Sequence, residues 1–331
     1  MARPKGSVNK KIGEDSIGED TRQSIVQQTS ETIKEVKKVL EKPTKEYTEK
    51  IDRLKKLMNE ANRKAGKTVL KFACDEAELD RISFGVDVID QLTGGGIPHK
   101  RFSILWGPKS AGKTTLCYRI IAQAQKQNKI CGLIDMERTF DPKWAVKQGV
   151  DLSKLILINT FPTAESAMDS FLDLVKGLAV DLVILDSVQA LSPKGEQETK
   201  KGVSKSLEDD TMALLARKLS QFFRISSGSV YEGNVAVLLV GQARMDLGGF
   251  IAFESLSGGH ALQHWSSMTI NIKRGAKADS PTKKVVVDGK KIDEITGFSC
   301  NIKLEKRKVD SKVEGSSVQL PFYFDNGFKN E

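Results

Sequence analysis

The chain has 331 residues, of which 29% are charged and 39% hydrophobic, a balance that fits one large globular domain or two smaller ones. No apolar run approaches the roughly 18 residues of a membrane-spanning helix, and the N-terminus lacks the hydrophobic segment of a secretory signal. The four cysteines are far apart in sequence, which argues against a disulfide framework or a cysteine metal site and predicts a cytoplasmic protein.

The formal net charge of +9 is concentrated in two zones of the sequence. Residues 1–71 hold 18 Lys and Arg against 11 Asp and Glu, and residues 273–312 hold 12 against 6. Basic zones around a near-neutral core are typical of proteins that contact a polyanion such as nucleic acid. A solvated surface explains the same distribution, so charge alone leaves DNA binding open.

The N-terminal part predicts a tail followed by a helix and a strand. Residues 1–45 are polar and charged, and we expect a mostly disordered basic tail there. Its start, ARPKGSVNKK, resembles part of an AT-hook, a DNA minor-groove motif, and a plain flexible tail is the alternative. Residues 46–64 place apolar side chains on one helical face, and KTVLKFACD, residues 67–75, predicts a strand. A short helix that ends at the glycines 94–96 is expected next.

From residue 101 onward, apolar strands alternate with helices. The predicted strands are RFSILWG, ICGLIDME, LILIN, DLVILDS and NVAVLLVGQ, and the predicted helices are residues 113–127, DPKWAVKQG, TAESAMDSFLDLVKGL and about 208–226. This alternation predicts an α/β fold with a mostly parallel twisted sheet that helices cover on both faces. Four shorter segments, SMTINIKR, KKVVVDG, GFSCNIKLEKRKV and VQLPFYF, predict a C-terminal antiparallel extension.

The stretch GPKSAGKT, residues 107–114, matches the phosphate-loop pattern G-x-x-x-x-G-K-[ST] between a predicted strand and a predicted helix. Its glycines let backbone N–H groups point at phosphate oxygens, and the helix N-terminus favours an anion. Lys113 supplies a cation for the β- and γ-phosphates, while the Thr114 hydroxyl can bind Mg²⁺. We expect a nucleotide to contact the whole loop: Gly107, Pro108, Lys109, Ser110, Ala111, Gly112, Lys113, Thr114 and Thr115.

Two carboxylates complete the expected nucleotide site. Asp186 ends the apolar strand DLVILDS and is the candidate that holds Mg²⁺ together with Thr114. Glu137 ends the predicted strand ICGLIDME, where a carboxylate can align and polarise the attacking water. Asp135 lies two residues earlier and is the competing candidate. A plain surface glutamate is the other interpretation of Glu137.

Five segments, in this order, resemble those of the RecA family of recombinases over about residues 50–328. They are GPKSAGKTTL, LIDMERTFDPKWAVKQGVD, VDLVILDSVQALSPK, LLVGQARMDLG and SGGHALQHWSSMTINIKR. The resemblance implies a RecA-type phosphate-loop NTPase core with ATP and Mg²⁺ as cofactors. It also implies a homo-oligomeric helical filament in the cytoplasm of a bacterial or phage-infected cell.

The same resemblance implies roles for particular residues. Glu137 matches the catalytic glutamate of the family, and Gln242 matches the glutamine that senses the γ-phosphate. Asp141 and Trp144 match the residues that hold the adenine. Lys306 and Lys308 match two lysines that reach into the ATP site of the neighbouring subunit, although a solvated strand face also explains them.

Two loops are candidates for DNA binding. Residues 193–210 form the first loop, and residues 243–257 form the second. Lysines neutralise phosphates, and an aromatic ring can wedge between stretched bases. Packing between subunits is the alternative role for the two phenylalanines. The candidate DNA contacts are Lys194, Lys200, Lys201, Lys205, Arg244, Phe250 and Phe253.

We therefore expect three parts: the tail (1–45), a helix–strand polymerisation element (46–80) and a RecA-like ATPase core (81–331). Lys109 and His264 depart from the family pattern, and we expect no separate C-terminal domain, which together predict a divergent member. The expected function is a DNA-dependent ATPase in recombination and repair. It would form filaments on single-stranded DNA and pair them with homologous duplex DNA, with single-strand-binding or loader proteins as possible partners. The alternatives are a RecA-like regulatory or mediator ATPase without strand exchange, and a hexameric helicase motor.

Overall fold

The structure is a computed structural model that describes residues 44–76, 78–197, 214–246, 253–256, 260–287, 290–308 and 314–329. It divides the chain into two compact units, residues 1–77 and 78–331, and we describe each unit by itself. The predicted basic tail lies outside the described residues, apart from Thr44 and Lys45.

The first unit contains the helix α2 (Lys45–Ala65), which the apolar spacing predicts. The hydroxyl of Thr44 accepts a hydrogen bond from the backbone N–H of Tyr47, and the helix ends at Gly66, where φ is +66°. None of the residues of α2 is buried. The first unit therefore carries an amphipathic helix whose apolar side remains exposed.

The predicted strand over residues 67–75 is wrong. Within the described residues, the segment 67–72 belongs to no strand, and Ala73–Asp75 form a short 3-10 helix. The reason is a side chain of α2 that takes the place of a strand partner. The Asn62 amide oxygen accepts the N–H groups of Val69 and Leu70 at 2.8 and 2.9 Å, and its amide nitrogen donates to the Leu70 carbonyl.

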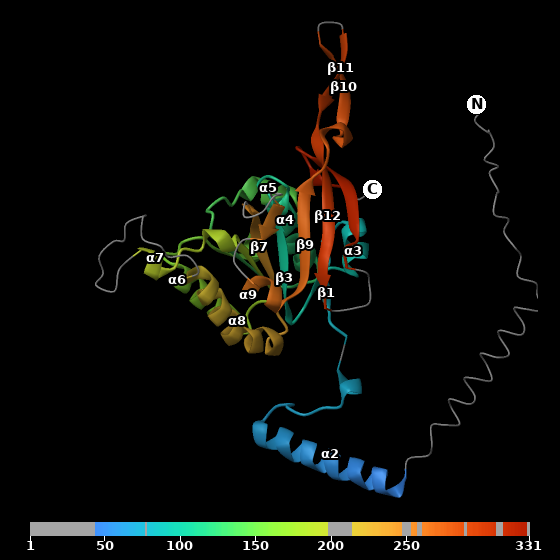
Figure 1. The fold of residues 1–331 in the computed structure, drawn as a ribbon, viewed down its shortest axis with the longest axis vertical. Helices are drawn as coiled ribbons and strands as arrows, with labels where there is room; N and C mark the ends of the chain where they lie inside the picture. The colour runs from blue at the N-terminus through green and yellow to red at the C-terminus, as the bar shows by residue number, and fades with distance from the viewer. Residues whose placement is uncertain are drawn as a thin grey trace, which may run out of the picture. The chain divides into compact units, whose positions relative to one another are not determined.

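The second unit is built around a ten-stranded sheet with the strand order β14-β13-β12-β9-β3-β7-β6-β4-β5, in which β8 pairs with β7 (Figure 1). The strands are β3 (Arg101–Gly107), β4 (Cys131–Asp135), β5 (Leu155–Ile158), β6 (Leu182–Asp186), β7 (Ala236–Asp246), β8 (Phe253–Leu256), β9 (Ser266–Arg274), β12 (Gly297–Arg307), β13 (Ser317–Tyr323) and β14 (Gly327–Phe328). The six strands from β9 to β5 are mutually parallel. This confirms the α/β fold with a mostly parallel sheet.

The antiparallel extension begins later in the chain than the sequence predicts. β9, which contains SMTINIKR, runs parallel to β3, and only β12, β13 and β14 continue the sheet in antiparallel fashion. A separate pair, β1 (Arg81–Ile82) and β2 (Ile97–Pro98), precedes β3. The sequence misses the direction of β9 because apolar and polar residues alternate in SMTINIKR, a pattern typical of antiparallel strands, whereas β9 follows the helix α9 (His260–Trp265) and runs parallel to β3.

The parallel strands are apolar along their length because helices bury both of their faces. In β6, Leu182 and Ile184 join a core cluster with α4, whereas Val183 and Leu185 join a second cluster with α6 and α8. The helices of this unit are α3 (Asp87–Thr93), α4 (Lys113–Lys126), α5 (Pro142–Lys147), α6 (Ala164–Lys176), α7 (Lys194–Gln197), α8 (Leu214–Glu232) and α9; 3-10 helices span Leu152–Lys154, Val188–Ala190 and Lys277–Asp279.

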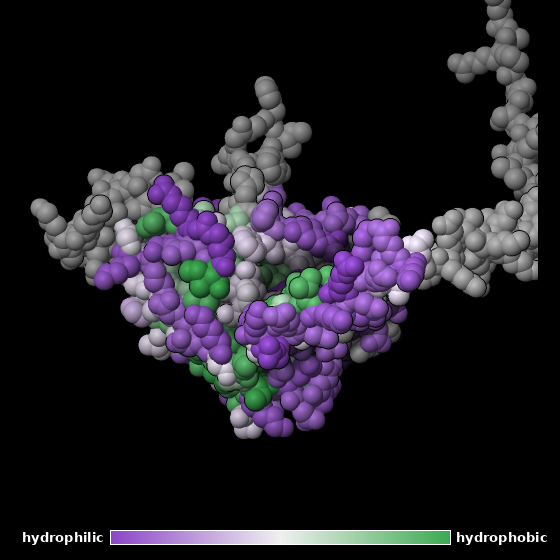
Figure 2. All heavy atoms as spheres, turned by 90° about the horizontal axis from the view of Figure 1, so that it is seen from below, coloured by the Kyte–Doolittle hydropathy of each residue, from purple (hydrophilic) through white to green (hydrophobic). Residues whose placement is uncertain are grey.

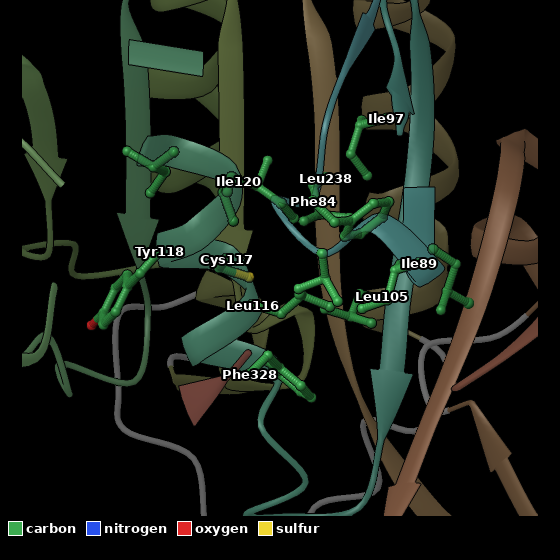
Figure 3. Close-up of a cluster of buried hydrophobic side chains, with 14 of the residues drawn as sticks. Phe84, Ile89, Ile97, Leu105, Leu116, Cys117, Tyr118, Ile120, Leu238 and Phe328 are labelled. Atoms are coloured by element: carbon green, nitrogen blue, oxygen red, sulfur yellow. The ribbon is translucent and has the colours of Figure 1, made fainter. Parts of the chain in front are cut away.

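The first cluster fixes α4, the helix that follows the phosphate loop, on the sheet. Figure 3 shows Leu116 and Ile120 of α4, together with Leu105 and Leu238 of the strands, around Phe84. All five side chains are fully or almost fully buried. Because α4 cannot shift without opening this cluster, the start of the helix stands in a fixed position beside the end of β3.

Helix α8 ends later than the predicted residue 226. It continues through Gly228 to Glu232 because Phe222, Phe223 and Val230 are buried against the sheet. Packing of this face outweighs the Ser- and Gly-rich composition of the segment. The predicted start of this helix lies outside the described residues.

A β-hairpin that the sequence does not resolve lies between β9 and β12. β10 (Thr282–Val287) and β11 (Lys290–Ile295) form a separate two-stranded sheet, which projects beyond the central sheet in Figure 1. Lys283 pairs in register with Glu294, and Lys284 with Asp293. Opposite charges therefore face one another at these two positions of the hairpin.

The exposed surface is largely polar. The face of the molecule in Figure 2 is mostly hydrophilic, with hydrophobic residues in separate smaller areas. Among the described helices, none is both long enough and apolar enough to cross a lipid bilayer.

Truncation of Phe171 tests the second core cluster. Its ring is fully buried on α6, and its centroid lies 4.9 Å from that of Phe222. Phe171→Ala should lower the free energy of unfolding by about 3–5 kcal/mol, because it removes a large apolar side chain and leaves a cavity. Urea denaturation measures the change. Ile225→Ala, which truncates an exposed side chain of α8, is the control and should change stability little; equal losses would contradict the assignment.

Candidate functional site

The phosphate loop connects β3 to α4, as its sequence predicts. A Cβ atom on Gly107 would collide with the carbonyl oxygen of Ile272, so only glycine fits at this close approach. Gly112 has φ of +96° and caps the start of α4, and Ser110 has φ of +57°. These left-handed residues curl the loop so that its backbone N–H groups can converge on an anion.

Lys113 is the first residue of α4, and its side chain folds back over the loop. Its ammonium group donates to the carbonyl oxygens of Gly107 at 2.9 Å and Pro108 at 2.7 Å. The residue is only 9% exposed, and this burial lowers the pKa of Lys113, while Asp186 and Glu137 oppose the shift. A largely buried ammonium group held in this position is suited to pair with an anionic phosphate group.

Thr114 and Asp186 form the next part of the site. The Thr114 hydroxyl donates to the Asp186 carboxylate at 2.9 Å. Burial raises the pKa of Asp186 to about 6, the hydrogen bond from Thr114 lowers it, and the charge of Glu137 adds to the rise. The Thr114 hydroxyl, in the first turn of α4, and the Asp186 carboxylate, at the end of β6, are thus the pair that the sequence predicts for Mg²⁺.

Glu137 lies at the centre of a hydrogen-bond network. Its Oε1 atom accepts hydrogen bonds from the Ser187 hydroxyl and from the Gln242 side-chain amide, both at 2.5 Å. The backbone N–H of Gln242 in turn donates to the Gln189 side chain at 2.8 Å. The carboxylate of Glu137, which follows β4, is therefore held between Ser187, which follows β6, and Gln242 of β7.

Asp135, the competing candidate, has a different environment. It is buried at the end of β4, and its carboxylate accepts the backbone N–H of Phe140 at 2.9 Å. It lines a smaller cavity of about 190 Å³ together with Arg138 and Asn159. Glu137, in contrast, lines the same cavity as Lys113.

That larger cavity has a volume of about 510 Å³ and brings most of the predicted nucleotide residues together. Four lining residues were missed by the sequence reasoning because they come from β9 and the antiparallel extension, far from the loop in the sequence. The predicted members are Lys109, Ser110, Gly112, Lys113, Thr114, Thr115, Glu137, Asp186 and Gln242, and the missed ones are Arg274, Phe298, Phe322 and Phe324.

Three phenylalanine rings form one wall of the cavity. Phe298 and Phe322 are stacked with centroids 4.6 Å apart, and Phe324 lies 6.2 Å from Phe298. Phe324 is 56% exposed, whereas the other two are buried. Such a wall offers a flat apolar surface near the phosphate loop. Two of its rings come from VQLPFYF and the third from GFSCNIKLEKRKV, segments whose patterns predict strands and no ligand contact.

Asp141 and Trp144, the predicted adenine contacts, lie beside this cavity and are not among its lining residues. The Asp141 carboxylate caps α5 by accepting the N–H groups of Lys143 and Trp144 at 2.9 and 3.1 Å. The Trp144 indole N–H donates to the hydroxyl of Thr115 at 3.0 Å. Trp144 thus reaches the nucleotide cavity through Thr115.

Lys306 and Lys308 lie away from the cavity of their own chain. Their ammonium groups donate to the carbonyl oxygens of Gln263 and His264, in the last turn of α9. A β-bulge between Leu304 and Lys306 changes the register at this point, which re-aims the side chains that follow. Burial lowers the pKa of Lys306, and the nearby charge of Lys308 lowers it further.

The candidate DNA contacts are described only in part. Lys194 is exposed in α7 and Arg244 is exposed in β7, whereas Lys200, Lys201, Lys205, Phe250 and the side chain of Phe253 lie outside the described residues. The second loop is shorter than predicted. Residues 243–246 pair with residues 253–256 in antiparallel register, because backbone hydrogen bonding extends β7 and forms β8.

Among the described residues, no group of three or more His, Cys, Asp and Glu side chains is arranged to hold a metal ion.

Comparison with known proteins agrees with the site. The profile of the family described as RecA N-terminal domain matches residues 52–329. The chain is 37% identical to Protein RecA of Marinobacter nauticus over 241 residues, 72% of this chain and 64% of the relative. It is 35% identical to Protein RecA of Allorhizobium ampelinum over 262 residues, 77% of this chain and 67% of the relative. The chain spans about two thirds of the length of these relatives, and it belongs to the RecA family.

Proposed function

We propose that the protein is a DNA-dependent ATPase that forms filaments on single-stranded DNA and promotes homologous pairing and strand exchange, in recombination and repair. One observation carries the proposal: the Glu137 carboxylate is hydrogen-bonded to Gln242, a residue of β7, the strand that leads into the second candidate DNA loop. A change at the nucleotide and a change at the loop can therefore influence one another through one side chain.

ATP is the proposed substrate, bound with its phosphates against the loop of residues 107–114. The N-terminus of α4, the Lys113 ammonium group and the curled backbone supply positive potential where three phosphates would need it. Among the aromatic wall residues, the exposed Phe324 ring is suited to the face of the base, and Trp144 donates to Thr115, which lines the same cavity. Phosphates and base would then occupy the two ends of one cavity.

A Mg²⁺ ion fits the pair Thr114 and Asp186. Their oxygens are 2.9 Å apart, and the buried Asp186 carboxylate has a raised pKa, as expected for a carboxylate that lacks a neutralising cation. A bound Mg²⁺ would neutralise charge on the β- and γ-phosphate oxygens. Thr114 and Asp186 would hold it, and Lys113 would lie beside the same phosphates.

Glu137 is the proposed catalytic carboxylate. Hydrogen bonds from Ser187 and Gln242 both fall on Oε1, so Oε2 is the oxygen left to align an attacking water. Asp135 is less suited to this role because the backbone of Phe140 occupies its carboxylate and it lines a different cavity.

Filament formation is proposed for the element at residues 46–80 and for two lysines. Leu54, Leu57, Val69 and Leu70 of this element are exposed, and an apolar surface of this kind is suited to a neighbouring protomer. Lys306 and Lys308 are not part of the cavity in their own chain, so we infer that they act on the nucleotide of a neighbour. A cation supplied in this way would stabilise charge on the transferred phosphoryl group.

Single-stranded and homologous duplex DNA are the proposed partners. The phosphate loop, the segment after β6 and the segment after β7 all leave the sheet at the C-terminal ends of parallel strands, which meet at one edge. The lysines of residues 193–210 would neutralise DNA phosphates, and Phe250 and Phe253 would stack on bases. Single-strand-binding or loader proteins of a bacterial or phage-infected cell are further proposed partners.

Electron microscopy with single-stranded DNA and a slowly hydrolysed ATP analogue tests the proposed function. Open helical filaments are expected. Closed rings would favour the helicase motor instead, and the absence of both assemblies would favour the mediator ATPase. A strand-exchange assay with homologous and non-homologous duplexes then separates a recombinase from a filament that only binds DNA.

Glu137→Gln tests the catalytic carboxylate. The substitution keeps the shape of the side chain but removes the charge that polarises water, so ATP hydrolysis should be lost while ATP and DNA binding persist. A coupled ATPase assay on single-stranded DNA and nucleotide titration measure both properties. Asp135→Asn is the matched comparison. If hydrolysis survives in Glu137→Gln and is lost in Asp135→Asn, then Asp135 and not Glu137 is the catalytic carboxylate.

Two pairs of loop substitutions test the DNA-binding residues. Phe250→Ala with Phe253→Ala should weaken single-strand binding by about 1–3 kcal/mol for each base that loses its stacking partner. Lys200→Ala with Lys201→Ala should instead reduce the slope of log affinity against log salt by about 0.7 for each phosphate that the loop no longer neutralises. Binding titrations at several salt concentrations measure both effects. The loop assignment is wrong if both pairs bind as the unaltered chain does.

Mixing two inactive variants tests the role of the lysines. Lys306→Ala with Lys308→Ala should keep nucleotide binding but lose DNA-stimulated hydrolysis, and Glu137→Gln should also be inactive. In a mixed filament, some interfaces join an intact Glu137 to an intact pair of lysines, so partial ATPase activity should return. Mixtures that co-assemble in the microscope yet recover no activity would show that the lysines do not act on a neighbour.

A further inference from the structure

Arg274 is the charged member of the four cavity-lining residues for which the sequence suggests no role. It is the last residue of β9, the strand next to β3. Its Nε–H group donates to the carbonyl oxygen of Ser110, in the middle of the phosphate loop, at 2.9 Å. Its guanidinium group also lies over the Phe298 ring, 4.2 Å from the centroid. Arg274 therefore joins the loop to the aromatic wall.

The bonded carbonyl group belongs to a residue in an unfavourable conformation. Ser110 has φ of +57°, a left-handed value that few residues other than glycine adopt without cost. The Ser110 carbonyl and the Ala111 N–H group belong to the same planar peptide unit and point in opposite directions. A hydrogen bond that fixes the Ser110 carbonyl therefore also fixes the direction of the Ala111 N–H group within the phosphate loop.

The contact with the Phe298 ring restrains the guanidinium group of Arg274. Phe298 is buried and stacked on Phe322, so the surface under the guanidinium group is itself held in place. A planar guanidinium on such a ring has restricted freedom, unlike a flexible ammonium group. The Nε–H group is consequently pre-oriented toward Ser110.

We propose that Arg274 is a positioning residue for nucleotide binding: it holds the left-handed turn of the phosphate loop at Ser110 and thereby orients the loop's backbone N–H groups toward the phosphates. This inference rests on the proposed nucleotide binding and adds a residue that acts through the loop. Because the effect is exerted on the loop, it concerns the phosphates and not the identity of the base.

Two substitutions separate the hydrogen bond from the charge. The glutamine side chain in Arg274→Gln would place an amide N–H donor as far along the side chain as the arginine Nε, and Arg274→Met has similar length without a donor. Both lose the charge. Arg274→Met should raise the Kd for a fluorescent ATP derivative about tenfold, and Arg274→Gln only about twofold to threefold. Titration of the full chain with Mg²⁺ and without DNA measures these constants.

Steady-state hydrolysis on single-stranded DNA gives a second measurement. In Arg274→Met, KM for ATP should rise with Kd while kcat changes less than about twofold, since the lost interaction serves binding and not the chemical step. Competition with unlabelled ATP and GTP should show the same relative loss for both. Lys303→Met removes an exposed cation from β12 outside the cavity and is the control, with an unchanged Kd.

Equal losses of nucleotide affinity in Arg274→Met and Arg274→Gln would show that the charge of Arg274, and not its hydrogen bond, supports binding, which would overturn the positioning role. An unchanged Kd in Arg274→Met, or a loss confined to one base, would overturn it as well. A wild-type chain that binds neither nucleotide would overturn the proposed function itself, and the inference with it. If the wild-type chain binds nucleotide and Arg274→Met binds it equally well, the proposed function stands and only the positioning role of Arg274 is wrong.

Discussion

The position of the Glu137 carboxylate depends on the register of three neighbouring parallel strands. Glu137 follows β4, Ser187 follows β6, and Gln242 belongs to β7, and the hydrogen bonds among them cross the middle strand. A displacement of any of these strands by one residue would turn the partner side chains to the opposite face of the sheet. The two core clusters that bury both faces of these strands therefore also maintain the candidate catalytic geometry.

The electrostatics of the site point to a ligand that carries both phosphates and a cation. Burial lowers the pKa of Lys113 and raises that of Asp186, so each group is held where its charged form is disfavoured relative to water. An anionic phosphate beside Lys113 and a cation beside Asp186 would relieve both penalties together. Lys113 and Asp186 already offset part of each other's penalty, and the proposed phosphate and cation would offset the remainder.

The sequence predicts the parts of the site that are local in the chain. The loop of residues 107–114 lies between an apolar strand and a helix, and Asp186 ends another apolar strand, so their chemistry and their place in the sheet follow from short-range patterns. The same patterns predict the helices and parallel strands, because burial on both faces requires apolar residues along the whole strand.

Pairing between segments that are distant in the chain leaves no local pattern in the sequence. Arg274 and the rings of Phe298, Phe322 and Phe324 meet the phosphate loop only because β9 pairs with β3 and β12 with β9. The strand predicted at residues 67–75 is wrong for a related reason. The apolar residues of the segment 67–72 are typical of a strand, but the Asn62 side chain makes the backbone hydrogen bonds that a neighbouring strand would have made.

The order of strands in the sheet divides the cavity into two sides with different tasks. β3 ends at the phosphate loop between them. On one side, β7, β6 and β4 lead to Gln242, Asp186 and Glu137, which are suited to activate water and hold a cation. On the other side, β9, β12 and the chain that follows β13 supply Arg274 and the aromatic wall, which are suited to hold the loop and the base. The first side continues into the candidate DNA loops, so under the proposed function Gln242 links the second loop to Glu137 without passing through Arg274 or the aromatic wall. Such an arrangement allows DNA to change the rate of hydrolysis while the nucleotide stays bound.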